Sequence, residues 1–322
     1  MITENDRKRK NVPKPAFWNN SKRYYDLKSY WLNLFGSPVH KLIIDAGFTC
    51  PNRDGNISRG GCAYCDSRGS ALRRKGPLPS VGEQLRQQRE FYNRRSQAKK
   101  FIAYFQTFTN TYAPVERLRE LYDEALQVED IIGLSIGTRP DCVPDETIAL
   151  IRGYAKRCHV WLELGLQSIH DKTLREINRG HDAATFRDAV RRAAGSPLLL
   201  CVHIIVGLPG ETKEMILETA REVAAMPLQG IKIHSLLALQ GTPLGGRYQK
   251  GELELMRKEL YVETVCDILE ILPPEMVIQR LTADGYRDIF LGPQWAGNKL
   301  AVINAINSEM ERRDSWQGKY FT

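Results

Sequence analysis

The chain of 322 residues carries 46 Lys and Arg against 38 Asp and Glu, which gives a net charge of +8, and 42% of its residues are apolar. This length and apolar content suit a single barrel of alternating strands and helices with a modest extension. No run of about 18 apolar residues occurs, and no apolar segment follows the basic N-terminus, so we expect neither a membrane span nor a secretory signal. A cytoplasmic protein without a membrane partner is therefore expected.

Residues 1–35 are polar and basic. The first 30 hold eight Lys or Arg against three Asp or Glu, interleaved with aromatic residues such as Trp18, Tyr25 and Tyr30. We expect this segment to be a flexible basic arm outside the main domain. Its aromatic side chains could stack on nucleic-acid bases, but they could equally pin the arm to the barrel.

Three cysteines, Cys50, Cys62 and Cys65, lie in a polar, glycine-rich loop that directly follows the first apolar run, residues 41–45. A loop can wrap an iron–sulfur cluster where a regular element cannot, and three thiolates leave one iron of a 4Fe–4S cluster open to react. A structural zinc site would need a fourth ligand at a matching spacing, and inert thiols fit poorly in such a polar loop. We therefore predict a 4Fe–4S cluster on these three cysteines.

Residues 68–100 form a second basic segment, with ten Lys or Arg against Glu83 and Glu90. Together with the N-terminal segment, they concentrate positive charge in a way that suggests a polyanionic partner such as RNA. The alternative is a solvated helix face over residues 83–100, because exposed helices often carry Arg.

From residue 36 onward, short apolar and β-branched runs alternate with amphipathic stretches. The expected strands are 41–45, 101–106, 131–136, 160–166, 199–206 and 231–237, and the expected helices are 80–95, 114–127, 145–157, 171–178, 183–194 and 211–226. Such alternation favours parallel strands with right-handed crossovers. It predicts an α/β fold over residues 36–243 with six strand–helix units, fewer than the eight of a full TIM barrel, and with the chemistry at the C-terminal ends of the strands.

The alternation ends after Thr242 and Pro243. Residues 244–322 predict an α+β extension that closes the open side of the barrel, with a helix near 251–271, a strand over 276–280 and a last helix near 297–313.

Several motifs resemble those of one enzyme family. Cys-Pro-Asn-Arg-Asp-Gly begins at Cys50, a Cys-x-x-Cys pair ends the loop, and Gly-x-Gln-Ser, Asn-Arg-Gly-His and Gly-Leu-Pro-Gly follow later. The chain resembles the radical S-adenosylmethionine (SAM) enzymes, in the branch of oxygen-independent coproporphyrinogen oxidase and elongator subunit 3, and most closely the YhcC-like members. It departs from most of the family in placing eleven residues, rather than three, between Cys50 and Cys62.

The resemblance implies a partial (β/α)6 TIM-type barrel over residues 36–243, a 4Fe–4S cluster on the three cysteines, and SAM as the second cofactor. The residues it implies as SAM contacts are Gln106, Thr138, Arg139, Glu163, Gln167, Arg179, Gly207 and Leu237. An Arg can pair with the SAM carboxylate through two hydrogen bonds. One alternative remains open, since Arg139 could instead form a local ion pair with Asp141. Glu163 stands in mid-strand, where a buried carboxylate needs a partner.

His203 and His234 stand within expected strands. They could donate protons or contact substrate, but a lone histidine in a strand is more often a hydrogen-bonded core group.

The resemblance further implies an enzyme that generates a 5′-deoxyadenosyl radical from SAM, supplied by an electron donor such as flavodoxin or ferredoxin. The basic segments and the likeness to elongator subunit 3 favour tRNA as substrate, for example conversion of carboxymethylaminomethyluridine to aminomethyluridine at the wobble position. One alternative is a radical SAM oxidase of tetrapyrroles or other small molecules. Another is a non-catalytic, cluster-containing RNA-binding protein.

Overall fold

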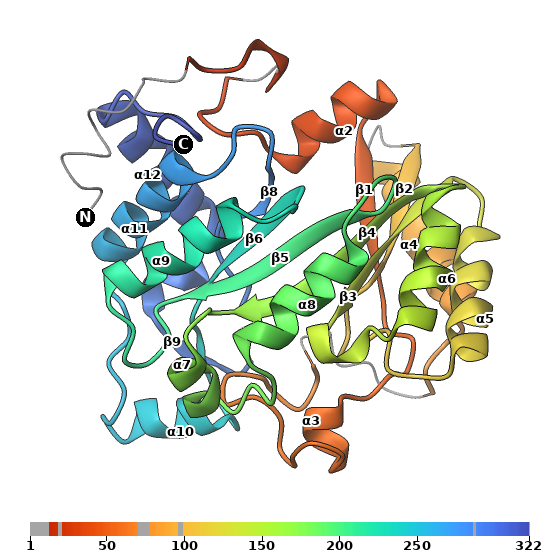
Figure 1. Cartoon of the computed structure of the whole chain (residues 1–322), viewed down its shortest axis with the longest axis horizontal. Helices are drawn as coiled ribbons and strands as arrows, with labels where there is room; N and C mark the ends of the chain where they lie inside the picture. The colour runs from red at the N-terminus through yellow and green to blue at the C-terminus, as the bar shows by residue number, and fades with distance from the viewer. Residues whose placement is uncertain (1–12, 19–20, 70–76, 96–98, 286–287, 322) are drawn as a thin grey trace.

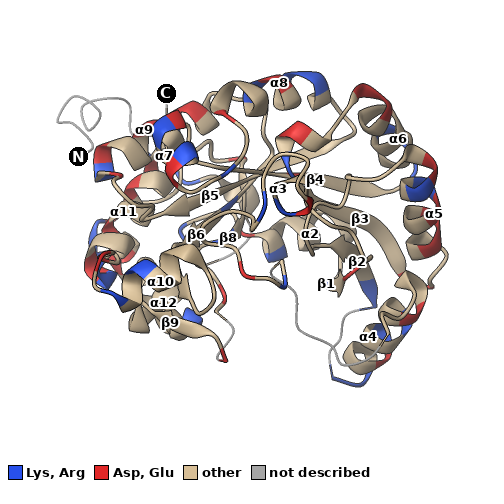
Figure 2. Cartoon of the chain, turned by 90° about the horizontal axis from the view of Figure 1, so that it is seen from below, with Lys and Arg blue, Asp and Glu red and all other residues tan. Residues whose placement is uncertain are grey.

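The computed structural model describes residues 13–18, 21–69, 77–95, 99–285 and 288–321 (Figure 1). Within these residues, seven strands form one parallel sheet in the order β1-β2-β3-β4-β5-β6-β8. The strands are β1 Val39–Ile44, β2 Lys100–Phe105, β3 Ile131–Thr138, β4 His159–Gln167, β5 Leu199–Val206, β6 Gly230–Ser235 and β8 Val277–Arg280. Figure 2 shows the sheet curled into part of a barrel. The expected α/β fold with a partial TIM-type barrel is confirmed, and its seventh strand comes from the C-terminal extension.

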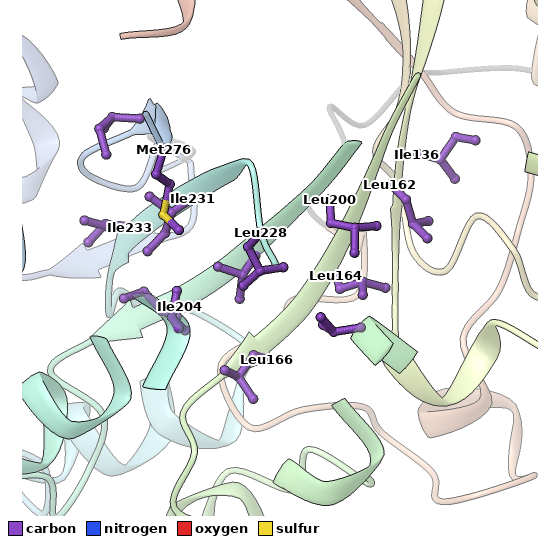
Figure 3. Packing of buried hydrophobic residues seen from close by; sticks show 14 of the residues in the cluster. Ile136, Leu162, Leu164, Leu166, Leu200, Ile204, Leu228, Ile231, Ile233 and Met276 are labelled. Atoms are coloured by element: carbon purple, nitrogen blue, oxygen red, sulfur yellow. The ribbon is translucent and has the colours of Figure 1, made fainter. Parts of the chain in front are cut away.

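Helices surround the outer face of the curved sheet (Figure 2). They are α4 Val81–Arg95, α5 Val115–Leu126, α6 Asp145–Ala155, α8 Ala183–Ala193, α9 Lys213–Ala224 and α11 Lys258–Ile271. On β4, Leu162, Leu164 and Leu166 belong to the large apolar core between sheet and helices (Figure 3). Successive side chains of a strand point to opposite faces, so Glu163 and Gln167 point into the barrel. The outward half of each strand therefore holds the fold together, and the inward half is free to carry polar groups.

The described part of the N-terminal segment packs against the N-terminal ends of the strands. Helix α2, Leu27–Phe35, contacts the two edge strands β1 and β8. The buried Trp18 donates its indole N–H to the Pro274 carbonyl at 2.9 Å, and the Tyr30 ring lies 5.8 Å from that of Trp161. These aromatic side chains thus pin the segment to the barrel. Residues 1–12 and 19–20 of the arm expected over residues 1–35 lie outside the described residues.

The C-terminal extension begins differently from the expected single helix over 251–271. Helix α10, Pro243–Gln249, is followed by Gly251 with φ +74° and by non-helical chain up to α11. Leu253 is buried beside Leu236 and Leu244. The expected helix start was wrong because Leu253 and Leu255 are spaced by two, as in extended chain, rather than by three or four.

The remaining elements are short or follow the expectation closely. Two strands, β7 Ala238–Leu239 and β9 Phe290–Gly292, pair antiparallel, so the strand expected over 231–237 ends at Ser235. The last helix, α12 Lys299–Arg312, is capped by Asn298, whose side chain accepts from the Ala301 amide at 3.0 Å. The other elements are η1 Ala16–Trp18, α3 Pro51–Asp54, η2 Pro140–Cys142, α7 Asp171–Glu176 and η3 Gln294–Gly297. In the described part of the chain, no helix is long and apolar enough to cross a membrane.

Candidate functional site

The cysteine loop lies at the C-terminal edge of the sheet, directly after β1, on the face that also carries α3, α7 and α10 (Figure 2). Cys50 precedes the one-turn helix α3, whose amides at Arg53 and Asp54 donate to its carbonyl at 2.8 and 3.1 Å. Cys62 is buried, Cys50 and Cys65 are half-buried, and all three thiols are free. We call this end of the barrel the cluster edge.

Two asparagines tie this loop to the turn that follows α7. The side-chain amide of Asn52 donates to the backbone carbonyl of Asn178 at 2.6 Å. The side-chain amide of Asn178 donates to the backbone carbonyl of Gly61 at 2.8 Å. Gly180 has φ +77°, and a Cβ there would lie 2.5 Å from Asn52 Oδ1. Asn178 and Gly180 of the Asn-Arg-Gly-His motif therefore support the cysteine loop. Both asparagines belong to motifs named from the sequence, but the sequence alone assigned neither of them this supporting role.

Arg179 sets the electrostatics of Cys62. Its Nη1 lies 3.5 Å from the Cys62 sulfur. Burial alone would raise the pKa of Cys62, but the charge and hydrogen bond of Arg179, with help from Arg139, lower it below the ordinary value. Burial and the neighbouring Cys62 raise the pKa of Cys65 to about 11. Because metal ligation requires thiolates, we expect cluster assembly to release a proton from Cys65.

Among the described residues, no three His, Cys, Asp or Glu side chains converge as the ligands of a single metal ion would. The thiolates of a 4Fe–4S cluster bind separate irons and need not converge on one point.

Gln167 and Arg179 meet at the end of β4. The register of β4 against β5 shifts between Gly165 and Gln167, and Gln167 has φ +79°, which is uncommon outside glycine. The Arg179 Nη2 donates to the Gly165 carbonyl at 2.6 Å. A Cβ at Gly165 would lie 2.7 Å from both the Arg179 guanidinium and the Gln167 amide, so only glycine lets them approach. Backbone strain of this kind gathers at functional sites.

Thr138 and Arg139 lie at the end of β3. The Thr138 and Thr111 hydroxyls are 2.6 Å apart. Arg139 forms a two-bond ion pair with Asp141, at 2.9 and 2.8 Å, so the local pair left open by the sequence is present. Gln106 directly follows β2, and its backbone N–H donates to the Ile44 carbonyl at 3.4 Å.

Gly207 and Leu237 lie at the same edge, after β5 and β6. Gly207 has φ +91°, which favours glycine, and the largely buried Leu237 packs with Ala283 and Ala296. The structure thus places these residues where the sequence predicts SAM contacts, and their binding roles stay predictions.

Buried polar atoms at the cluster edge fit the aminoacyl end of SAM. Arg139 Nη1, Arg179 Nε and Thr107 Oγ1 are buried without a hydrogen-bond partner among the described residues. A buried donor left unpaired is costly, and a carboxylate can satisfy guanidinium and hydroxyl donors together. With three thiols beside them, these residues fit both cofactors.

Glu163 lies apart from that group, in the middle of the barrel. Its carboxylate accepts from Lys41 at 2.6 Å and from His203 at 2.8 Å, and it also contacts Ser135 and Lys232. Four donors already occupy its two oxygens. Its contact with SAM stays a prediction, but the geometry gives it partners inside the barrel. The sequence analysis assigned no role to Lys41 or Lys232, which take inward positions on β1 and β6.

A partial barrel with a three-cysteine loop at its C-terminal edge defines a radical SAM enzyme. In agreement, residues 52–223 match the family model of the radical SAM superfamily, and residues 228–312 match the radical SAM C-terminal domain. The chain belongs to the radical SAM superfamily. Within it, the chain falls with the YtqA- and YhcC-like proteins: it is 43% identical to YtqA of Bacillus subtilis, over 97% of this chain and 96% of that protein, and 41% identical to YhcC of Escherichia coli, over 82% and 85%.

The chain is also more distantly similar to proteins outside the YtqA- and YhcC-like group. A protein named tRNA uridine(34) acetyltransferase, from Methanocaldococcus infernus, is 28% identical over 52% of this chain and 33% of its own length. The structure of the Elp3 protein from the same organism, lacking its N-terminus, superposes with a TM-score of 0.59 and 19% identity, over 87% of this chain and 64% of that one. The superposition shows a shared fold.

Superfamily membership implies a 4Fe–4S cluster, SAM and a source of electrons. When bound, the cluster and SAM supply a 5′-deoxyadenosyl radical by reductive cleavage of SAM. The chain's own residues hold and orient both cofactors.

Replacing Arg179 with Ala is expected to weaken SAM binding by about ten- to a hundred-fold, because one charge-assisted hydrogen bond contributes roughly 1.5–3 kcal/mol. The measurement is the SAM dissociation constant of protein with equal iron content. Arg175→Ala, which removes an exposed arginine of α7, serves as the control. Unchanged SAM affinity in Arg179→Ala would place the carboxylate site elsewhere.

Proposed function

We propose that this radical SAM enzyme modifies tRNA at the C5 substituent of the wobble uridine, converting carboxymethylaminomethyluridine to aminomethyluridine. The observation that carries the proposal is the similarity, across half of the chain, to a protein named for uridine 34 of tRNA. The excess of positive charge in this chain is consistent with a polyanionic substrate.

The fold gives the two ends of the basic segment different places. Because β1 and β2 are parallel, the C-terminal end of α4 lies at the N-terminal edge of the sheet, opposite the cysteine loop. Arg94 there pairs with Glu90, Arg95 lies 4.4 Å from the centre of the Phe91 ring, and Lys100 donates to the Phe35 carbonyl at 3.2 Å. These residues are far from where a nucleotide would meet SAM.

Near the other end of the basic segment, the described residues on either side of 70–76 lie at the cluster edge. Arg73, Arg74 and Lys75 lie outside the described residues, but their flanks are described. The Gly69 carbonyl accepts from the Phe108 amide, at 3.4 Å, and Leu78 lies beside Gly47. Both contacts are made at the C-terminal ends of β1 and β2. We therefore expect the main phosphate contacts near this edge of the sheet, and the basic run Arg73, Arg74 and Lys75, which the sequence places between the two flanks, is the part to test.

The direct test compares the nucleosides of tRNA from cells with and without the gene. We expect carboxymethylaminomethyluridine to accumulate without the gene, and purified enzyme with SAM and reductant to convert it in that tRNA. An unchanged wobble uridine in the cells, together with no conversion by the enzyme, would favour the small-molecule alternative.

Neutralising Arg73, Arg74 and Lys75 together to Gln should weaken tRNA binding and flatten its salt dependence. Each lost phosphate contact lowers the slope of log K against log salt by about 0.7–0.9. The matched variant, with Arg94, Arg95 and Lys99 changed to Gln, should keep a slope closer to that of the parent. The measurement is tRNA affinity at several salt concentrations. A shallow slope in the parent would contradict phosphate-driven binding altogether.

A further inference from the structure

One inward polar side chain from each strand of the seven-stranded sheet lies inside the barrel, below the cluster edge. We call this set the interior polar layer: Lys41 (β1), Tyr104 (β2), Ser135 (β3), Glu163 (β4), His203 (β5), Lys232 (β6) and Gln279 (β8). Glu163 is at its centre, and Lys41 bridges the edge strands by donating to Gln279 at 2.9 Å.

The interior polar layer carries more positive than negative charge. Lys41 and Lys232 share the one carboxylate of the layer, that of Glu163. His203 adds no charge at neutral pH, because burial and the nearby Lys232 lower its pKa to about 4 despite Glu163. Burial likewise raises the pKa of Tyr104 well above its ordinary value, so the phenol stays neutral. Two ammonium groups in a poorly solvated interior with one anion favour the entry of a second anion.

The two lysines differ in their free hydrogen-bonding capacity. An ammonium has three donors. Lys41 donates to Glu163, Ser135 and Gln279, which uses all three. Within the described ranges, Lys232 donates to Glu163 and to the Tyr104 hydroxyl, the latter at 2.8 Å, which leaves one of its three N–H groups without an acceptor there. Burial lowers the pKa of Lys232 to about 7 despite Glu163, and Lys41 adds to the lowering. An added anion beside Lys232 would stabilise its charged form.

A second unfilled group stands next to Lys232. His234 follows it by two residues on β6 and therefore points to the same side, one step nearer the cluster edge. Its Nε2 is buried and lacks a partner in the part of the chain that the structure describes. Its ring centre lies 5.3 Å from that of His203. The two histidines thus differ in their hydrogen bonding. His203 is hydrogen-bonded to Glu163, whereas the Nε2 of His234 has no partner among the described residues.

The interior polar layer lies directly below the predicted SAM site. On β4, Glu163 is two residues before Gly165, whose carbonyl bonds the Arg179 guanidinium, and two residues of strand span about 7 Å. At the other end, Trp161 is buried against Tyr25 and Trp18 and closes the barrel. Although Lys41 and His203 lie inside, their side chains are 13% and 18% exposed, so solvent reaches these two members of the interior polar layer.

We propose that Lys232 and His234 form an anion site inside the barrel that binds the carboxylate of the substrate. The identity of this carboxylate rests on the proposed function: it is the end of the carboxymethylaminomethyl substituent. The CH2 groups of that substituent then lie between the interior polar layer and SAM. Lys41 and Glu163 position Lys232, and the site distinguishes the substrate from the product, which lacks the carboxylate.

The first experiment measures binding of two anticodon stem-loop RNAs, with carboxymethylaminomethyluridine or aminomethyluridine, to cluster-loaded protein with SAM and no reductant. We expect about ten- to a hundred-fold tighter binding of the carboxylate-bearing RNA. Lys232→Met should bring this ratio close to one, and His234→Phe should reduce it. Lys156→Met, at an exposed position, should keep it. A ratio unchanged in both Lys232→Met and His234→Phe overturns the proposal.

The second experiment keeps the anion site testable if RNA is not the substrate. The full-length protein with isotope-labelled histidine is titrated with acetate or, as the neutral analogue, acetamide at constant ionic strength, while the His234 resonance is followed. We expect acetate alone to shift it, and Lys232→Met to abolish the shift. An acetate shift without discrimination between the RNAs rejects the tRNA function but supports the anion site. No acetate shift and no RNA discrimination in the parent overturns the site.

Discussion

Replacing Cys50, Cys62 or Cys65 with Ala is expected to abolish both the iron–sulfur absorption and the reductive cleavage of SAM. Each thiolate binds one iron, so its loss exposes an iron and makes the cluster labile. The check is the iron content of anaerobically reconstituted protein, the absorption of the cluster and the yield of 5′-deoxyadenosine. We expect each single variant to lose all three together.

Cys158→Ala is the matched control. Cys158 lies just before β4, at the opposite edge of the sheet, and its thiol contacts the Tyr154 carbonyl at 3.5 Å. This variant should retain iron and SAM cleavage. If the triple variant of Cys50, Cys62 and Cys65 still held four irons per chain, the cluster would have to be bound elsewhere.

The sequence predicted the barrel because each strand has one strongly apolar half. Leu162, Leu164 and Leu166 place β4 under the helices, and the same periodic signal marks the other units. The strand at Val277 was expected to belong to the extension that closes the barrel. No signal in the local sequence indicates that it pairs with β6 as the seventh strand of the sheet. Sheet order depends on contacts between distant segments, which periodicity does not contain.

Site residues that stand in short motifs could be predicted from the sequence. Site residues that come together only through the register of neighbouring strands could not. The three cysteines, Gln167 and Arg179 could be named because they stand in short motifs. Lys232 could not, because a lysine in a strand is usually exposed, and only the register between β4, β5 and β6 brings it to Glu163. The interior polar layer therefore appears only once seven strands are curled together.

The interior polar layer also determines the surroundings and the charge state of Glu163 on β4. A contact of Glu163 with SAM stays a prediction, and the structure shows four hydrogen-bond donors around its carboxylate inside the barrel. Its ammonium and imidazole partners lower its pKa well below the ordinary value, outweighing the opposing effect of burial. Glu163 therefore stays ionised near neutral pH, where it anchors Lys41 and Lys232 rather than exchanging protons.

Glu163→Gln is expected to lower the free energy of unfolding by about 3–5 kcal/mol, the usual effect of removing one partner from a buried ion pair. The variant leaves Lys41 and Lys232 buried without a counter-charge, and the new amide N–H groups face donors rather than acceptors. The measurement is the urea midpoint of the cluster-free protein at pH 7. Glu120→Gln is the matched control, because Glu120 pairs with Arg117 at 2.8 Å on the exposed surface, and its loss should change stability by at most about 1 kcal/mol.

The double variant Glu163→Gln, Lys232→Met tests whether the charge pair itself is responsible. Removing Lys232 from the Glu163→Gln protein also removes one of the uncompensated charges, so the double variant should lose less stability than the sum of the two single variants. Direct contact between the residues predicts a coupling of about 0.5–3 kcal/mol. Additive effects, or a Glu163→Gln midpoint equal to that of the parent, would show that this carboxylate does not anchor the lysines.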